Sequence, residues 1–587
     1  MASFRFLYDE TGTPRPWVWP AVIALLAIAA SLSGITNQWT QDEIAIIWGN
    51  PRMHDLRAVG RFFVDPYWPP PFVPALYRPF ASVSYALEWA ASGGTPLLFR
   101  ITSYLLYAAC SVLVFRLARL RLPLVAAAMV GALFAVHPVH VEAVALAVNQ
   151  NELWVALISS GAVVLYLRER SSGSALLTRS RLILVGLYLA GCLFKENAFV
   201  LPGLLLAAEV LLVRTAEPLA TRIAQGRRLL LPLVLVAVTV YWVRTQVLHG
   251  NLAGDSVAEG LVGQTVAGRA LTMLSVVPHW FRLLFWPAHL QADYNPSEIV
   301  AQTAWGPMQT LGLLLLVATL LVALAAWRRA PVLTFGVAWC AVALFPVHNV
   351  IVSTGIVLAE RTLFLPSIGA MLALGGLGAF LLERGGARVR LALAAAAGAL
   401  IVLGVYRSTT RHPVWKDQFT LWYRTANVDA PRSFHGHEAL ADAYFNIGVE
   451  KLAESEYRLA IALSPKTIIR TKLAYADKLR SRGFCYRAAQ LYREALDFWP
   501  PYQTARASLI ACALDLGRYR EAMFHARMGI SFEWERPVFQ LALATAEKAL
   551  RDGAPPGTIR LVVPEKLISS PYLKIGSSPS LKIGAKR

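Results

Sequence analysis

Long apolar runs separated by short polar segments occupy the first two thirds of the chain. The runs lie at 17–35, 99–118, 122–137, 152–168, 181–195, 197–213, 229–247, 307–326, 331–347, 362–382 and 390–406. Because a helix needs about 20 apolar residues to cross a bilayer, this pattern predicts about eleven transmembrane helices. A further segment, 269–288, is interrupted by Pro278 and Pro287. We expect it to form a re-entrant or interfacial pair of half-helices, with another span as the alternative.

After Tyr406 the pattern changes to charged, amphipathic helices that contain an internal repeat. Gly448, Ala453, Tyr457, Ala460 and Pro465 recur 35 residues later as Gly483, Ala488, Tyr492, Ala495 and Pro500. This period resembles that of the tetratricopeptide repeat, in which small residues let paired helices approach closely. The repeats predict a short α-solenoid whose concave surface docks a peptide or partner; a purely structural stack is the alternative.

These patterns together predict an all-α protein with two domains. The boundaries are a polytopic membrane domain at 1–410 with an outer loop at 36–98, a linker at 411–433, a repeat domain at 434–550 and a tail at 551–587. We expect little order in the tail, which is rich in Pro, Gly, Ser and Lys. The first apolar run follows Asp9 and Glu10 rather than a basic segment, which favours an uncleaved anchor helix over a signal peptide.

Composition supports a membrane protein and excludes several other classes. Hydrophobic residues make up 56% of the chain and charged residues only 16%, whereas soluble proteins carry roughly 25% charged residues. The net charge of +20 comes largely from Arg in short loops, where positive charge sets membrane orientation, so we expect no nucleic-acid partner. The five cysteines have no spacing that suggests zinc or a disulfide framework.

The loop charges predict the topology. Arginines gather at 116–121, 168–181, 214–228, 328–329 and 384–390. If these loops are cytoplasmic, the N-terminus is cytoplasmic as well and the repeats lie outside, provided that 269–288 does not cross. The Ala- and Arg-rich spans favour the inner membrane of a bacterium with a GC-rich genome.

The opposite face collects acids, bases and imidazoles instead. They are Asp42, Glu43, Arg78, His137, His140, Glu142, Lys195, Glu196, Arg244, Asp293, Glu360 and Arg361. Each one alone is explained by polar residues that reach the membrane interface. Their concentration on one face indicates a functional site.

The acidic pair Asp42-Glu43 is the candidate for proton transfer. A carboxylate just outside the bilayer can act as a general base towards an acceptor hydroxyl, and partial burial would tune its pKa. In an extended segment adjacent side chains point in opposite directions, so we expect one of the two to face the site. A solvated acidic pair is the alternative.

Four cations on the same face are candidates for binding phosphate. Arg78, Lys195, Arg244 and Arg361 all lie near the ends of predicted helices. Arginine is suited to bidentate phosphate binding, and Pro79 would fix Arg78 at a helix entrance. Contact with lipid headgroups is the alternative for each of them.

The segment His137–Glu142 offers two imidazoles and a carboxylate. His and Glu are good metal ligands. However, a proline lies between His137 and His140, and no nearby Cys or further His completes a ligand shell. Hydrogen bonding to a phosphate or sugar is the favoured interpretation, with a divalent metal as the less favoured one.

In this arrangement the chain resembles the transmembrane and tetratricopeptide-repeat O-mannosyltransferases, which are C-type glycosyltransferases. The matching residues are Asp42-Glu43, Tyr77-Arg78-Pro79, Phe134 through Val144 (FAVHPVHVEAV), Asn151-Glu152-Leu153, Phe194-Lys195-Glu196, Asp293-Tyr294 and Ala359 through Ser367 (AERTLFLPS). The chain departs from the family in having about three repeats, Asp-Glu at the acidic pair, and no Arg in Val-Asn-Gln-Asn at 148–151.

The resemblance implies a C-type glycosyltransferase fold with a seven-helix core. It implies an inverting transfer of mannose or a related hexose from a polyprenyl-phosphate donor to a protein hydroxyl, with no cofactor or metal required. Carried over, Asp42 is the general base and Glu43 its support. The donor-phosphate candidates are Arg78, Lys195 and Arg361. The expected partners are the lipid-linked donor, an acceptor protein and membrane lipid.

Two other functional classes remain open at this point. An O-antigen ligase or polymerase would place its functional Arg and His in a long late outer loop, whereas the late outer loop here, about 348–361, is short. A transporter would carry charged residues near the middle of the membrane, whereas here the charges gather at one face. A scaffold that recruits partners through its repeats is the non-enzymatic alternative.

Overall fold

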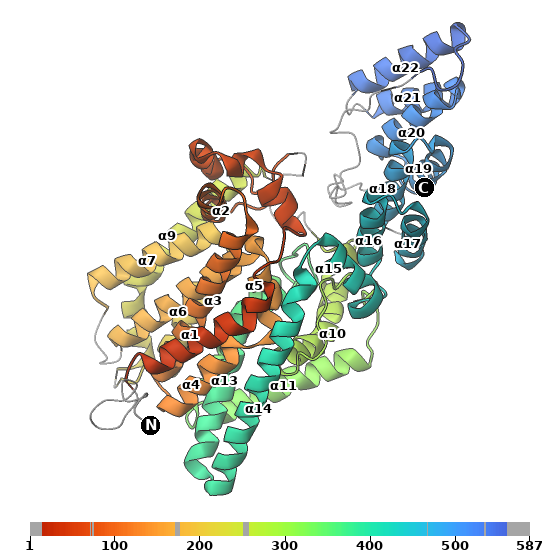
Figure 1. Ribbon diagram of the computed structural model, residues 1–587. Coiled ribbons are helices and arrows are strands. Elements are labelled where there is room, and N and C mark those ends of the chain that lie inside the picture. The colour runs from red at the N-terminus through yellow and green to blue at the C-terminus, as the bar shows by residue number, and fades with distance from the viewer. Residues whose placement is uncertain are drawn as a thin grey trace. The chain divides into compact units, whose positions relative to one another are not determined.

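The computed structural model describes residues 15–70, 72, 75–170, 176–215, 217–250, 257–465, 468–532, 536–559 and 561. Within these ranges the chain forms helices and connecting loops, with no β-strand (Figure 1). It divides into two compact units, the first formed by most residues up to Ala430 and the second by most residues from Pro431 onward. The predicted all-α class is therefore confirmed. The tail at 562–587 lies outside the described residues.

Each apolar run predicted to span the membrane falls on a helix of the first unit. These helices are α1 (Val18–Ser31), α3 (Pro96–Arg119), α4 (Leu124–Ala135), α6 (Gln150–Arg170), α7 (Thr178–Phe194), α8 (Leu201–Leu212), α9 (Leu219–Val247), α11 (Pro307–Ala326), α12 (Pro331–Leu344), α13 (Phe364–Arg384) and α14 (Ala387–Arg411). In the described part, five helices are long and apolar enough to cross a bilayer, and a bent pair could supply a sixth. The first unit is thus a multi-pass membrane domain.

The segment 269–288 differs from its prediction. It forms one continuous helix, α10 (Val266–Phe285), which runs through Pro278 and ends before Pro287. The expected pair of half-helices is therefore wrong. A proline removes one backbone hydrogen bond but need not end a helix whose flank is packed, and Val276, Val277 and Trp280 around it are buried.

The helices of the first unit pack around α3, which lies against α1, α4 and α6 (Figure 1). The closest pair is α12 and α13, where a Cβ atom added to Gly336 or Gly369 would overlap the backbone of the facing helix. Small residues allow this approach, which is how helices associate where lipid provides no hydrophobic driving force. By contrast, α14 leaves Leu391 and Val402 exposed, as expected for a lipid-facing helix.

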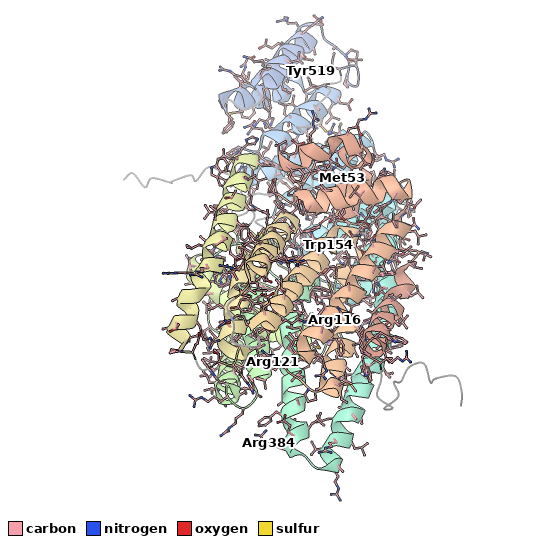
Figure 2. All side chains as sticks on the ribbon, turned by 90° about the vertical axis from the view of Figure 1, so that its left-hand side faces the viewer. Met53, Arg116, Arg121, Trp154, Arg384 and Tyr519 are labelled. Carbon is pink, nitrogen blue, oxygen red and sulfur yellow. The ribbon has the colours of Figure 1, made fainter. Side chains whose placement is uncertain are left out.

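The arginine-rich helix ends and the outer loop lie at opposite ends of the first unit. Figure 2 shows Arg121 and Arg384 towards one end and Met53 at the other. Met53 belongs to the loop 36–98, which folds into η3 (Ile44–Trp48), η4 (Pro51–His54), η5 (Leu56–Phe63) and α2 (Pro79–Ser92). Buried side chains of the loop, including Ile47, Phe62 and Tyr85, form one apolar cluster with residues from 141–148 and 414–421. The loop is therefore held in place by packing against the helical domain.

Residues 412–429, expected to form most of a linker, instead pack into the first unit. They form η13 (His412–Trp415), α15 (Gln418–Arg424) and η14 (Thr425–Asp429). Trp415 and Leu421 are fully buried there. These two large apolar side chains attach the segment to the core.

The second unit is a row of helices in which each packs against the next. They are α16 (Phe434–Asn446), α17 (Glu450–Leu463), α18 (Arg470–Ser481), α19 (Cys485–Phe498), α20 (Gln503–Asp515), α21 (Tyr519–Ser531) and α22 (Arg536–Arg551). The repeated residues occupy equivalent places: the Tyr457 hydroxyl donates to Asp442, and Tyr492 donates to Asp477. Gly448 and Gly483 have φ angles of 82° and 81°, which explains why glycine recurs after the first helix of each pair.

Candidate active site

Asp42 lies in a strained turn at the start of the outer loop. The preceding residue, Gln41, has a φ angle of 49°, in the left-handed region that non-glycine residues rarely adopt. Gln418 holds this turn by accepting hydrogen bonds from the backbone of Gln41 and the hydroxyl of Thr40. Asp42 itself begins a helical turn that leads into η3, rather than the extended segment expected from the sequence.

Glu43 points away from Asp42 into the protein. Its carboxylate forms a bidentate ion pair with Arg100 of α3, with distances of 2.6 and 2.9 Å, and both side chains are fully buried. It also accepts hydrogen bonds from the backbone amides of Thr40 and Ala147. With every oxygen engaged and no exposure, Glu43 fixes the turn in place and is not available to accept a proton from a substrate.

Arg78 and Glu196 form a second bidentate pair at the entrance to α2. The distances are 2.6 Å from Arg78 Nη2 to Oε1 and 3.1 Å from Nε to Oε2. Arg244 lies 3.8 Å from the same carboxylate. As expected, Pro79 is the first residue of α2. The guanidinium of Arg78 also lies over the ring of Tyr67, 5.4 Å from its centre.

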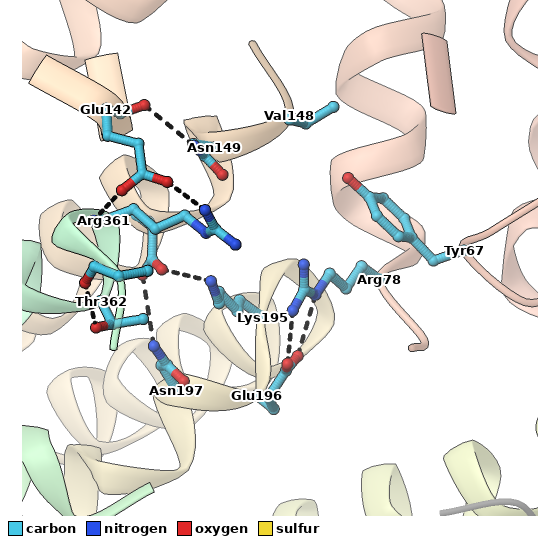
Figure 3. Close-up of polar contacts among 12 residues, drawn as sticks. Tyr67, Arg78, Glu142, Val148, Asn149, Lys195, Glu196, Asn197, Arg361 and Thr362 are labelled. Carbon is cyan, nitrogen blue, oxygen red and sulfur yellow. Dashed lines mark hydrogen bonds and ion pairs between the residues drawn. The ribbon is translucent and has the colours of Figure 1, made fainter. Parts of the chain in front are cut away.

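Lys195 and Arg361 complete a group of three paired cations. Lys195 donates to Glu152 at the start of α6, while Arg361 donates to Glu142 through both its side chain and its backbone amide, the latter at 2.8 Å. Figure 3 shows Lys195 between Arg361 and Arg78, and the three residues come from different elements. We call Arg78, Lys195 and Arg361 the cation cluster.

Within the described part of the chain, Asp42 differs from the other acids of this region in having no hydrogen bond or ion pair to its side chain. Among the described residues its side chain makes no hydrogen bond or ion pair, although Arg361, Glu142 and Arg78 all lie within electrostatic range. Its side chain is partly exposed. The structure therefore brings a free, reachable carboxylate next to the cation cluster.

The protein shifts the pKa values of Asp42 and Glu196 in opposite directions. Burial, together with the nearby Glu142 and Glu43, raises the pKa of Asp42 despite the opposing effect of Arg361 and Arg78. For Glu196, burial alone would raise the pKa, but Arg78 and Arg244 hold it well below its ordinary range. A carboxyl group with a raised pKa is the better proton acceptor near neutral pH, and a permanently ionised one is a positioning group.

Three of the acids around the cation cluster are engaged by cations. In the described part of the chain no three His, Cys, Asp or Glu side chains gather as a metal site would require. The carboxylates of Glu142, Glu152 and Glu196 are each occupied by a cation. Paired cations that retain further N–H donors are suited to an anionic ligand instead.

The two histidines of the HPVH segment lie in the core, not in the cation cluster. His140 uses both ring nitrogens, one towards Tyr107 at 3.0 Å and one towards Ser367 at 2.7 Å, and is 1% exposed. His137 likewise faces the carbonyl of Leu284 at 3.0 Å and accepts from the amide of Val139. Neither has a nitrogen left for a substrate, so the structure does not support the expected phosphate or sugar contact.

Glu360, the first residue of η12 (Glu360–Leu363), contacts the loop that contains Asp293. The Glu360 carboxylate accepts hydrogen bonds from the backbone amide of Gln291 and the hydroxyl of Tyr294, at 2.6 and 2.9 Å. Asp293 lies in the same loop, beside Tyr294. Glu360 and Arg361 are adjacent in η12, yet Arg361 belongs to the cation cluster and Glu360 contacts Gln291 and Tyr294.

Four further residues of the site had no role predicted from the sequence: Glu152, Arg100, Asn197 and Tyr67. Glu152 opens α6 and is held by Lys195 and by Asn197, whose amide donates to it at 3.4 Å. Arg100 lies within the apolar run 99–118. A charged residue at the outer end of such a run was the available signal, because a buried charge needs a partner.

Several curated proteins are similar to this chain over most of its length. Protein O-mannosyl-transferase Tmtc1 of Drosophila melanogaster is 24% identical over 70% of the chain, and protein O-mannosyl-transferase TMTC3 of Mus musculus is 22% identical over 80%. The chain is similar to the TMTC O-mannosyltransferases. Protein O-mannosyl-transferase F38B6.6 of Caenorhabditis elegans, 21% identical over 76% of the chain, agrees. The resemblance drawn from the sequence motifs is therefore confirmed.

The similarity covers only part of each relative. The chain spans 57%, 58% and 62% of the lengths of these three proteins. No protein-family model and no solved structure matches the chain.

Proposed function

We propose that this protein is an inverting membrane glycosyltransferase. It moves mannose or a related hexose from a polyprenyl-phosphate donor to a hydroxyl group of a protein. The observation that carries the proposal is Asp42, a carboxylate free of ion pairs and partly exposed beside the cation cluster. The relatives, named protein O-mannosyl-transferases, support the reaction class.

In the proposed reaction, the acceptor hydroxyl gives its proton to the Asp42 carboxylate. The acceptor oxygen forms a bond to the anomeric carbon of the sugar as the bond from that carbon to the phosphate oxygen breaks. The bonding electrons leave with the phosphate, whose negative charge Arg78, Lys195 and Arg361 stabilise. A single displacement inverts the anomeric carbon and needs neither a metal nor a cofactor.

The roles of the other charged groups follow from their contacts. Glu142, Glu152 and Glu196 hold the three cations in place, and Arg244 supports Glu196. Glu43 and Arg100 anchor the Asp42 turn to α3. Positioned charges stabilise a transition state better than mobile ones, because no reorganisation is needed as the reaction occurs.

We further propose eleven membrane crossings and a C-type glycosyltransferase fold, in the inner membrane of a bacterium. The arginine-rich end of the first unit faces the cytoplasm, and Asp42 faces the periplasm. In the second unit, the recurring helix pairs and the repeated Tyr–Asp hydrogen bonds support a tetratricopeptide-repeat solenoid. This solenoid would dock the acceptor protein or a partner.

The test is sugar transfer in membranes from a polyprenyl-phosphate donor to acceptor protein. We expect Asp42→Asn to lower the rate about 10²- to 10⁴-fold, the usual contribution of a general base. The matched control is Asp55→Asn, an exposed residue of the same loop that caps η5 and that asparagine can replace as a cap. Full activity in Asp42→Asn, with the control also active, would rule out the proposed base.

A further inference from the structure

The outer end of α14 carries two arginines with unpaired, buried N–H groups. Arg411 is 1% exposed, and only its Nη1 pairs, with Asp429. Its Nε and Nη2, and the Nε of Arg407, are buried without a hydrogen-bond partner among the described residues. Leaving buried donors of a charged group unpaired is unfavourable, so their partner is expected to be a group outside the protein chain.

The charges around these arginines leave a positive excess. Arg407 lies within electrostatic range of Arg411, Arg424, Asp429 and Glu360. Asp429 is already shared between Arg411 and Arg424, the latter at 3.4 Å. Three guanidinium groups therefore face two carboxylates. The uncompensated charge favours an anion here.

The same side of α14 becomes apolar towards the membrane. Leu400 and Leu403 precede Arg407 and Arg411 at spacings of three and four residues, which places all four on one side of the helix. The two leucines are 41% and 53% exposed. An elongated ligand bound along this side would contact the two leucines with one part and the two arginines with its end.

We propose that Arg407 and Arg411 bind the phosphate group of a membrane lipid whose apolar chain lies along Leu400 and Leu403. Arginine is well suited to phosphate, and two arginines one turn apart present several donors to one group. The lipid is either a membrane phospholipid or a prenyl phosphate. The site is separate from the cation cluster, since Arg361 pairs with Glu142 in that cluster, whereas Glu360 lies within electrostatic range of Arg411.

The proposal does not depend on the transfer reaction, because it is tested by binding alone. The full-length protein in detergent is mixed with a long-chain prenyl phosphate, the matching prenyl alcohol, phosphatidylglycerol or inorganic phosphate, and bound molecules are counted by native mass spectrometry. We expect a phosphate-bearing lipid to bind and the alcohol to bind at least tenfold more weakly. Preference for the prenyl phosphate or for phosphatidylglycerol identifies which lipid is the ligand.

Variants locate the site. Arg407→Gln removes no ion pair of the described structure, and we expect it to weaken lipid binding about tenfold or more, as for the loss of a hydrogen bond to a charged group. The pair Arg411→Gln with Asp429→Asn, which removes both charges together, should act in the same direction. The matched control is Arg388→Gln at the exposed, opposite end of α14, which should bind as the parent protein does.

Three results would overturn the proposal. One is equal binding by the parent protein and Arg407→Gln, with both folded by thermal unfolding. Another is equal binding of the prenyl phosphate and the alcohol. The last is no lipid binding at all, which would leave ordered water as the partner of the unpaired N–H groups.

Discussion

Both ends of the helical bundle hold a buried carboxylate among arginines, but the two networks differ in whether the acids are all paired. At the arginine-rich end, Glu209 of α8 accepts from Arg170, Arg222 and Tyr166 at 2.7 to 3.2 Å. At the opposite end, the carboxylates beside the cation cluster are paired in the same way, except for Asp42. A fully paired network holds helices together, whereas an unpaired acid beside it can exchange a proton.

A buried acid next to a cation can either hold the structure together or exchange a proton. The pair of Glu43 and Arg100 resembles that of Glu209 and Arg170, because both are bidentate and buried, although Glu43 is adjacent in sequence to Asp42. Position in the chain therefore does not distinguish the two roles. The number of partners around each carboxylate does.

The largest expected effect on folding comes from breaking the Glu43 bridge. We expect Glu43→Gln to destabilise the protein by about 3–5 kcal/mol, because it leaves Arg100 charged, buried and without its counterion. Thermal unfolding in detergent would measure this loss. The double variant with Arg100→Met should recover part of the stability. If Glu43→Gln unfolds like the parent protein, the bridge is not the anchor that the structure indicates.

The next effect distinguishes the two ends of the bundle. Removing Arg361 by Arg361→Gln should lower sugar transfer by about 10²- to 10³-fold, as for the loss of one stabilising donor of the transition state. Arg222→Gln, at the other end, should lower the unfolding temperature and leave the transfer rate of the folded protein nearly unchanged. Equal losses of transfer in the two variants would remove the distinction between a structural and a reactive network.

The smallest expected effect concerns the strained turn before Asp42. Gln41→Gly should change the free energy of unfolding by less than about 1 kcal/mol, because glycine adopts positive φ freely. Gln41→Val should cost about 1–3 kcal/mol, since a β-branched residue fits this conformation poorly. Both variants keep the backbone hydrogen bond from residue 41 to Gln418. A difference in their free energies of unfolding, measured by chemical or thermal unfolding, therefore reports the backbone conformation of residue 41. Similar unfolding of the two variants would show that the turn is not strained.

Much of the fold could be predicted from the sequence because membrane helices are defined locally. The apolar runs coincide with α1, α3 and the other long helices, and the recurring Tyr457 and Tyr492 make equivalent hydrogen bonds. The prediction failed for α10 and for residues 412–429. In both places contacts with distant elements decide the structure: buried side chains surround Pro278 in α10, and Trp415 and Leu421 are buried in the first unit.

The candidate site was predictable only in part, for a related reason. Sequence position placed Asp42, Arg78, Lys195 and Arg361 on one face, and the structure brings them together. It could not show that Glu43 is bound by Arg100, or that His140 is held between Tyr107 and Ser367. Those contacts join residues far apart in the chain, so no local spacing indicates them.

The central claim is that Asp42 is the unpaired acid that accepts the proton, and the pH dependence of transfer tests it most directly. A base works when ionised, and the raised pKa of Asp42 means that its ionisation is completed at a higher pH than for an ordinary aspartate, about 3.9. We therefore expect kcat/KM to fall on the acidic side with a midpoint above that value. The residual activity of Asp42→Asn should lack this acidic limb. An unchanged acidic limb in Asp42→Asn would contradict the claim.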